Sequence, residues 1–138
     1  MNLEESYIMI DESDGWHIQR FFFDTYAFFE ILNGNENYKK YNNFSIVTSK
    51  LNLFELYFNI LRNVNSVEAE RVFDKYYPFV IDFDEEVIKE AARLKMLLNK
   101  RDVSMTDCIG YCLAKQLGVR FLTGDDAFEN LDNVEFVI

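Results

Sequence analysis

Acidic side chains directly follow two apolar runs in this sequence. Asp24 comes after residues 21–23, which are all phenylalanine, and Asp125 and Asp126 come just after residues 119–123. Short apolar runs of this kind are typical of strands buried on both faces. In α/β sheets, ligands bind outside the carboxyl ends of the strands, so we expect these carboxylates at the functional edge.

Two further carboxylates lie on predicted helices. Glu55 lies in a helix predicted over residues 50–62, and its wide apolar arc indicates a well buried helix. Asp107 lies near the start of a helix predicted over residues 105–117. Four acidic side chains in one cleft would raise each other's pKa values, and a hard cation such as Mg²⁺ or Mn²⁺ resolves that repulsion. Such an ion also activates water and stabilises charge on a phosphodiester.

Each of these carboxylates also has an ordinary structural explanation. Asp24 suits a helix N-cap, and Asp125 suits a turn. Glu55 belongs to a polar stripe that can be a solvated helix face. Asp107 lies three residues after Ser104, which is the spacing of a capping box. Each signal is weak when taken alone, and only their combination predicts a metal site.

The composition excludes several classes of protein. The 138 residues carry 24 acidic and 14 basic side chains and a formal net charge of −10, which argues against a basic protein that coats nucleic acid. An aromatic fraction of 17% argues against a disordered acidic tail. With His17 as the single histidine, Cys108 and Cys112 cannot complete a zinc site, and we interpret both cysteines as small buried side chains.

Residues 1–19 are interpreted as an acidic N-terminal appendage to a single domain over residues 20–138. The appendage contains a short apolar patch at residues 7–10, which can pair as an edge strand or stay loose. It lacks the basic and apolar regions of a signal peptide, and no apolar run approaches the roughly 18–20 residues of a membrane helix. We therefore expect a cytoplasmic protein with reduced cysteines and no membrane partner.

Strand and helix patterns alternate after residue 20. Apolar runs predict strands over residues 21–23, 44–48, 79–81, 119–123 and 134–138. Helical patterns cover residues 25–33, 50–62, 66–77, 85–100 and 105–117, with a short polar helix or loop at 36–42 and a helical turn at 128–131. This alternation predicts an α/β fold, a three-layer α/β/α sandwich with a mainly parallel central sheet.

The segments around the four carboxylates resemble the motifs of PIN-domain nucleases, in the same order along the chain. They are residues 22–30, 52–57, 107–114 and 121–128. The third and fourth are the most specific, because an aspartate opens a helix of small residues and a strand then runs into Thr-Gly-Asp-Asp and Phe. The second motif is weak alone. The resemblance covers about residues 20–138.

This resemblance implies a Mg²⁺- or Mn²⁺-dependent endoribonuclease, similar to the VapC toxins of type II toxin–antitoxin pairs. The motifs imply that the metal-binding and catalytic carboxylates are Asp24, Glu55, Asp107 and Asp125. Thr123 would orient the site through its hydroxyl, and Asp126 would assist as an acid outside the metal ligands. The implied partners are an RNA substrate, a second copy of the chain in a homodimer, and a cognate antitoxin.

The chain departs from the family pattern at three places. Tyr26 stands where many members carry Asn or Ser, and Ala127 stands where many carry Asp. The small-residue helix has Gly, Tyr and Cys at residues 110–112 in place of the commoner alanine run. These departures leave the four carboxylates intact and bear on how a substrate is positioned.

Two other interpretations remain open from the sequence. One is a PIN-like scaffold that binds RNA or a protein without cutting. The other is a haloacid-dehalogenase-like phosphatase, which would need an Asp where Tyr26 stands. Basic residues could line an RNA path but form no dense run, so we expect scattered surface charge and weak sequence-independent RNA affinity. These residues are Lys39, Lys40, Lys50, Arg62 and Arg71.

Overall fold

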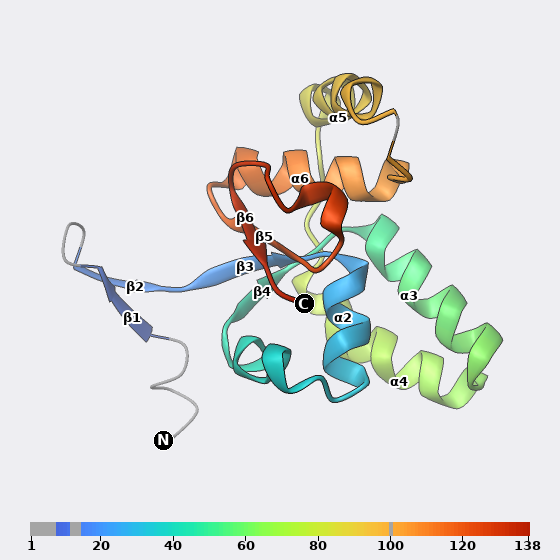
Figure 1. Cartoon of the computed structure of the whole chain (residues 1–138). Coiled ribbons are helices and arrows are strands. Elements are labelled where there is room, and N and C mark those ends of the chain that lie inside the picture. The colour runs from blue at the N-terminus through green and yellow to red at the C-terminus, as the bar shows by residue number, and fades with distance from the viewer. Residues whose placement is uncertain (1–7, 12–14, 100) are drawn as a thin grey trace.

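The computed structural model describes residues 8–11, 15–99 and 101–138, with side chains from Gln19 onward (Figure 1). No helix among these residues has the length and apolarity needed to cross a membrane. The elements in chain order are β1 (Ile8–Asp11), β2 (Gly15–Ile18), β3 (Arg20–Phe23), α2 (Thr25–Leu32), the 3₁₀ helix η1 (Glu36–Asn43), β4 (Ser45–Val47), α3 (Lys50–Asn63), α4 (Ser66–Tyr76), η2 (Tyr77–Phe79), α5 (Glu85–Leu97), α6 (Met105–Leu117), β5 (Arg120–Thr123), η3 (Asp126–Phe128) and β6 (Val134–Phe136).

Four short parallel strands form the central sheet, in the order β4-β3-β5-β6. In the register of β3, Phe21 lies opposite Ile46 of β4, and Phe22 lies opposite Phe121 of β5. On the other side of β5, Phe121 lies opposite Val134 of β6. The predicted α/β fold with a parallel central sheet is therefore confirmed.

Helices cover both faces of this sheet, which gives the three-layer arrangement (Figure 1). Successive side chains of a strand point to opposite faces. Accordingly, Phe21 and Phe23 pack in a core shared with α2, α3 and α4, whereas Phe22 packs in a second core with α5 and α6. The continuous run of phenylalanines is stable in a strand because both of its faces are covered.

Gly110 lets α6 approach the sheet closely. A Cβ atom at this position would lie 2.9 Å from Cε1 of Phe22 and 3.2 Å from Cε1 of Phe121. The two large rings beneath the helix occupy the space that an alanine would need. This packing explains why the small-residue helix carries glycine at that position.

The strand predicted over residues 79–81 is wrong. Residues Tyr77–Phe79 form the 3₁₀ turn η2, and Val80 forms an isolated parallel bridge with Thr48, just after β4. In this bridge the N–H of Thr48 donates to the carbonyl oxygen of Phe79 at 3.0 Å, and the N–H of Ile81 donates to that of Thr48 at 2.9 Å. Pro78 has no N–H to donate, and the N–H of Val80 bonds back to the carbonyl oxygen of Tyr77 at 3.1 Å. A local turn and a single bridge therefore stand where a strand ladder was predicted.

Most other bounds agree with the sequence prediction to within one residue, and three elements differ by two residues or more at an end. α5 ends at Leu97, before residue 100, and β6 ends at Phe136, before residue 138. The turn predicted at 128–131 lies at Asp126–Phe128, because the side chain of Asp125 caps it. Arg101 thus lies beyond α5, and its guanidinium donates to the carbonyl oxygen of Ala127 at 3.1 Å.

The N-terminal strands form a hairpin outside the main sheet. β1 pairs antiparallel with β2, with Ile8 opposite Ile18. β2 leads into β3, and Figure 1 shows the hairpin extending away from the body past the amino-terminal end of β3. It therefore lies away from the edge where the strands end. The rest of the proposed appendage, including Tyr7 of the apolar patch, lies outside the described residues.

Candidate active site

Asp24 lies at the carboxyl end of β3 and caps α2. Its side chain is only 2% exposed. Oδ1 accepts a hydrogen bond from the backbone N–H of Thr25 at 2.9 Å, and Oδ2 accepts one from the hydroxyl of Thr123 at 2.8 Å. Asp24 is therefore both the N-cap that the local sequence predicts and a buried carboxylate held by two donors.

Thr123 ties the ends of two neighbouring strands together. It is fully buried at the end of β5, and its hydroxyl donates to Asp24 and accepts from the backbone N–H of Asp125 at 3.1 Å. β3 and β5 are adjacent, with Phe23 opposite Leu122, so the hydroxyl spans the two motifs directly. An orienting role for Thr123 requires contacts of this kind.

A chain of hydrogen bonds holds Glu55 against the start of α2. Oε1 of Glu55 accepts from the Thr25 hydroxyl at 2.8 Å, and that hydroxyl accepts from Nδ2 of Asn52 at 3.0 Å. Ser49 donates to Oδ1 of Asn52 at 2.6 Å. Asn52 is fully buried and Glu55 is half-buried, so this part of the polar stripe is not a solvated face.

Thr25 and Asn52, which orient Glu55, were not among the site residues predicted from the sequence, whereas Thr123 was. Thr25 had a usable signal, since a hydroxyl at the first position of α2 directly follows Asp24. Asn52 also had one, because it lies three residues before Glu55 on the same side of a helix. Their bonding to each other could not be read from the chain, because it depends on how α3 packs against α2.

Asp107 belongs to the capping box that its spacing predicts. The backbone N–H of Ser104 donates to Oδ2 of Asp107 at 2.9 Å, and the N–H of Asp107 donates to the Ser104 hydroxyl at 3.1 Å. The box fixes one carboxylate oxygen at the start of α6. The structural explanation is therefore right, and it is compatible with a second role for the other oxygen.

Asp125 and Asp126 differ in their surroundings. Oδ1 of Asp125 accepts from the N–H of Ala127 at 3.0 Å and caps η3, which agrees with the predicted turn. Asp126 is exposed, and its side chain takes part in no hydrogen bond or ion pair within the described part of the chain. The structure brings Asp125 to the site and leaves Asp126 outside the hydrogen-bond network.

The carboxylates act on one another's pKa values. Burial raises the pKa of Asp24 well above its usual range, and the charges of Asp107 and Glu55 raise it further, against the hydrogen bonds of Thr123 and Thr25. Burial also raises the pKa of Asp107, to which the charge of Asp125 adds. For Glu55, burial and the charge of Asp107 raise the pKa. We call these four side chains, Asp24, Glu55, Asp107 and Asp125, the carboxylate cluster.

No cation compensates the carboxylate cluster in the described residues, because none of their ion pairs involves any of its four members. Buried negative charges that repel one another are stabilised by a metal ion, and carboxylate oxygens suit Mg²⁺ or Mn²⁺. Among those residues, however, no three His, Cys, Asp or Glu side chains are already arranged to hold a metal ion. The donor chemistry thus fits such an ion, although protein donors hold both oxygens of Asp24.

Tyr26 lies beside the carboxylate cluster and packs on Gly124. A Cβ atom at Gly124 would collide with the Tyr26 ring and would lie 2.5 Å from the carbonyl oxygen of Val137. Burial raises the pKa of Tyr26, and the charges of Glu30 and Asp125 add to this. A large ring can occupy this position because the neighbouring residue has no side chain.

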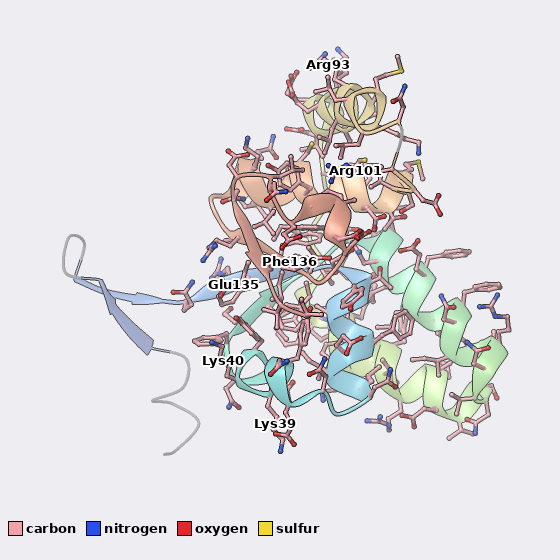
Figure 2. All side chains as sticks on the ribbon, viewed as in Figure 1. Lys39, Lys40, Arg93, Arg101, Glu135 and Phe136 are labelled. Atoms are coloured by element: carbon pink, nitrogen blue, oxygen red, sulfur yellow. The ribbon has the colours of Figure 1, made fainter. Side chains whose placement is uncertain are left out.

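The basic side chains are dispersed, as their spacing predicts. Lys39 and Lys40 lie on η1, whereas Arg93 lies on α5 at the other end of the view (Figure 2). Lys50 pairs with Asp82 at 3.6 Å. A continuous basic path is therefore not built from these residues.

Known structures share this fold at low sequence identity. A toxin–antitoxin complex from Klebsiella pneumoniae is 13% identical with a TM-score of 0.66, covering 83% of this chain and 94% of that one. DNA-bound VapBC from Salmonella typhimurium is 18% identical with a TM-score of 0.67, covering 87% and 98%. Mycobacterium tuberculosis VapC20, described as a sarcin–ricin loop cleaving toxin, is 16% identical with a TM-score of 0.70, covering 83% and 97%.

Comparison with curated proteins finds no match. A family model, the PIN domain, matches residues 21–134, which is most of the chain. The matched range contains all four members of the carboxylate cluster. The chain belongs to the PIN-domain family.

Proposed function

We propose that this protein is a Mg²⁺- or Mn²⁺-dependent endoribonuclease that hydrolyses RNA phosphodiester bonds. The observation that carries the proposal is the geometry of the carboxylate cluster. Asp24 and Asp125 follow the neighbouring parallel strands β3 and β5, and Thr123 and Thr25 tie Asp24 and Glu55 to this edge of the sheet, where the charges of the cluster raise one another's pKa values. A cluster of this kind is costly in the folded protein unless a cation binds to it. Its position agrees with the edge at which α/β sheets bind ligands.

In this proposal the carboxylate cluster holds the metal ion. A bound ion would supply a water of lowered pKa and stabilise charge on the phosphodiester. The contribution of the chain itself is positioning. Thr123 holds Asp24, and Thr25 links Asp24 to Glu55. Hydrogen bonds of this type fix the directions of carboxylates before a ligand arrives.

We further propose that the protein is the toxin of a type II toxin–antitoxin pair, with a cognate antitoxin and a second copy of the chain as its partners. The support is the fold shared with the Klebsiella toxin–antitoxin complex and with VapC20. Both are matched over more than nine tenths of their own length.

Cleavage of single-stranded RNA by the purified chain tests the enzymatic part. We expect internal cleavage in Mn²⁺ that is lost in Asp24→Asn and in Asp107→Asn, because each removes one negative ligand while keeping the shape of the side chain. Asp74→Asn is the matched control, since Asp74 is exposed on α4 and outside the carboxylate cluster.

The alternatives give different results in the same assay. Cleavage that persists in excess chelator would overturn the metal dependence. RNA binding without turnover in either metal would instead indicate a scaffold. Hydrolysis of a small phosphomonoester that depends on Asp24 would indicate a phosphatase.

A further inference from the structure

Two phenylalanines protrude from α3 next to the carboxylate cluster. Phe54 and Phe58 are 69% and 47% exposed. Their ring planes are parallel to within 1°, and their centroids lie 6.2 Å apart. They lie one helical turn apart on the face opposite the core, so they contribute little to the packing of α3. Exposed apolar side chains that gather in one place mark interaction sites.

The aromatic pair adjoins the face of α3 that carries Glu55. At about 100° per residue, Phe58 lies roughly 40° around the helix from Phe54, and Glu55 lies roughly 60° beyond Phe58. Glu55 is held toward the start of α2 by Thr25. A ligand lying along this side of α3 would therefore touch the rings and reach the carboxylate cluster together.

A positive charge lies at the end of the aromatic pair. The guanidinium of Arg62 is 5.2 Å from the centroid of the Phe58 ring, within the range of a cation–π contact. The same group donates to Oδ1 of Asn59 at 3.0 Å. Within the described residues Arg62 forms no ion pair, so no carboxylate neutralises it.

Two parallel rings with a guanidinium beside them suit a single nucleic-acid strand better than a protein surface. Successive bases of a single strand lie parallel to one another, and proteins bind them by stacking on aromatic side chains. A guanidinium beside the stack can meet the phosphate between two bases. An apolar protein partner needs neither parallel ring planes nor an uncompensated positive charge.

We propose that Phe54, Phe58 and Arg62 form a stacking platform that places single-stranded RNA across the carboxylate cluster. This inference rests on the proposed ribonuclease function and names the side chains outside the carboxylate cluster that position the RNA. Unpaired bases next to the cleaved phosphate stack on the two rings, and Arg62 contacts the backbone. Bases inside a duplex cannot reach the rings, so the platform selects unpaired RNA.

Fluorescence of an oligoribonucleotide that contains 2-aminopurine tests this platform, because stacking quenches that base. The full-length chain carrying Asp107→Asn is titrated into the oligonucleotide so that cleavage does not interfere. We expect quenching on binding, and in the same background Phe58→Leu should remove it and weaken binding by roughly tenfold or more. Phe58→Trp should retain both, which separates loss of the ring from loss of structure.

Two further variants sharpen the readout. Arg62→Gln should weaken binding and make it less dependent on salt, as expected for the loss of one phosphate contact. Phe79→Leu is the matched control, because Phe79 is also a partly exposed phenylalanine but lies on η2. It should bind and quench like the parent chain. In the otherwise unaltered enzyme, Phe58→Leu should raise KM for single-stranded RNA more than it lowers kcat.

Several outcomes overturn the platform. One is parent-like affinity and quenching in Phe54→Leu and Phe58→Leu. Another is unchanged RNA affinity with an altered oligomeric state in light scattering, which would assign the rings to a protein interface. If the unaltered enzyme cleaves RNA and these variants show the same KM, the platform is refuted and the ribonuclease function stands. Quenched binding without any cleavage in Mn²⁺ would do the reverse, retaining the platform and refuting the proposed function.

Discussion

The hydroxyl of Thr123 donates to Oδ2 of Asp24 across 99 positions of sequence. This bond favours the ionised form of Asp24, whereas burial and the charge of Asp107 favour the protonated form. The protonation state of the most buried carboxylate is therefore set by its own burial and by residues on separate elements, Thr123 on β5 and Asp107 on α6 among them.

Replacing Thr123 with valine keeps the branched shape and removes the donor. The pKa of Asp24 should then rise further, because the bond that lowers it is lost. We expect the acid limb of the cleavage–pH profile to move to higher pH. We also expect the free energy of unfolding to fall by about 1–3 kcal/mol, since buried polar groups lose their hydrogen-bond partner.

Thr123→Ser is the control for this substitution, because it retains the hydroxyl and should keep the acid limb in place. The pH profile and a denaturant titration measure the two effects. An unchanged acid limb in Thr123→Val would contradict the role given to this bond.

Metal-free protein should lose stability as the pH rises. The folded-state pKa values of Asp24, Glu55 and Asp107 are raised, so the folded state binds more protons than the unfolded state. The contribution of these groups to the free energy of unfolding is fully present below the ordinary carboxylate pKa range. It is lost as the pH rises through their raised pKa values. Denaturant titrations in chelator across this range measure the slope.

Asp24→Asn tests whether the buried carboxylates cause this pH dependence. Asp24→Asn keeps an N-capping side chain but cannot ionise, so the slope should become shallower and the neutral-pH protein more stable than the parent. Mn²⁺ should restore the parent's stability at neutral pH, because a ligand that binds only the folded state stabilises it. A parent chain whose stability rises with pH in chelator would refute the proposed repulsion.

Asn52→Leu should weaken metal-dependent cleavage by roughly 10–100-fold, the usual effect of losing a group that orients a metal ligand. Asn52 holds the Thr25 hydroxyl, which in turn donates to Glu55. Because the ligands themselves remain, the defect should appear as a higher Mn²⁺ requirement. Asn63→Ala, at an exposed position of the same helix, should leave the Mn²⁺ titration unchanged.

Gly124→Ala should destabilise the fold by about 1–3 kcal/mol, as overpacked sites do. The added methyl would meet both the Tyr26 ring and the carbonyl oxygen of Val137. Tyr26→Ala combined with Gly124→Ala should recover only part of the loss, because the carbonyl contact remains. A double-mutant cycle by chemical denaturation measures this, and full recovery would show that the backbone contact is harmless.

Much of the fold could be predicted because buried strands and amphipathic helices leave clear patterns. The strand at residues 21–23 and the helix around Glu55 are examples, and the sheet edge then places Asp24 and Asp125 together. The segment at 79–81 could not be separated from a strand by its apolar residues, since its turn bonds are local and leave no apolar signature. The links from Asn52 through Thr25 to Glu55, and from Tyr26 to Gly124, depend on tertiary packing that no short pattern encodes.

The strand order also has a consequence for synthesis on the ribosome. β5 lies between β3 and β6, yet it is translated after β3, β4 and the helices α2 to α6. A growing chain therefore carries Asp24, Glu55 and Asp107 long before Thr123 and Asp125 can join them. Whatever chemistry the assembled residues perform is withheld from the nascent chain and begins only once β5 has emerged and inserted beside β3.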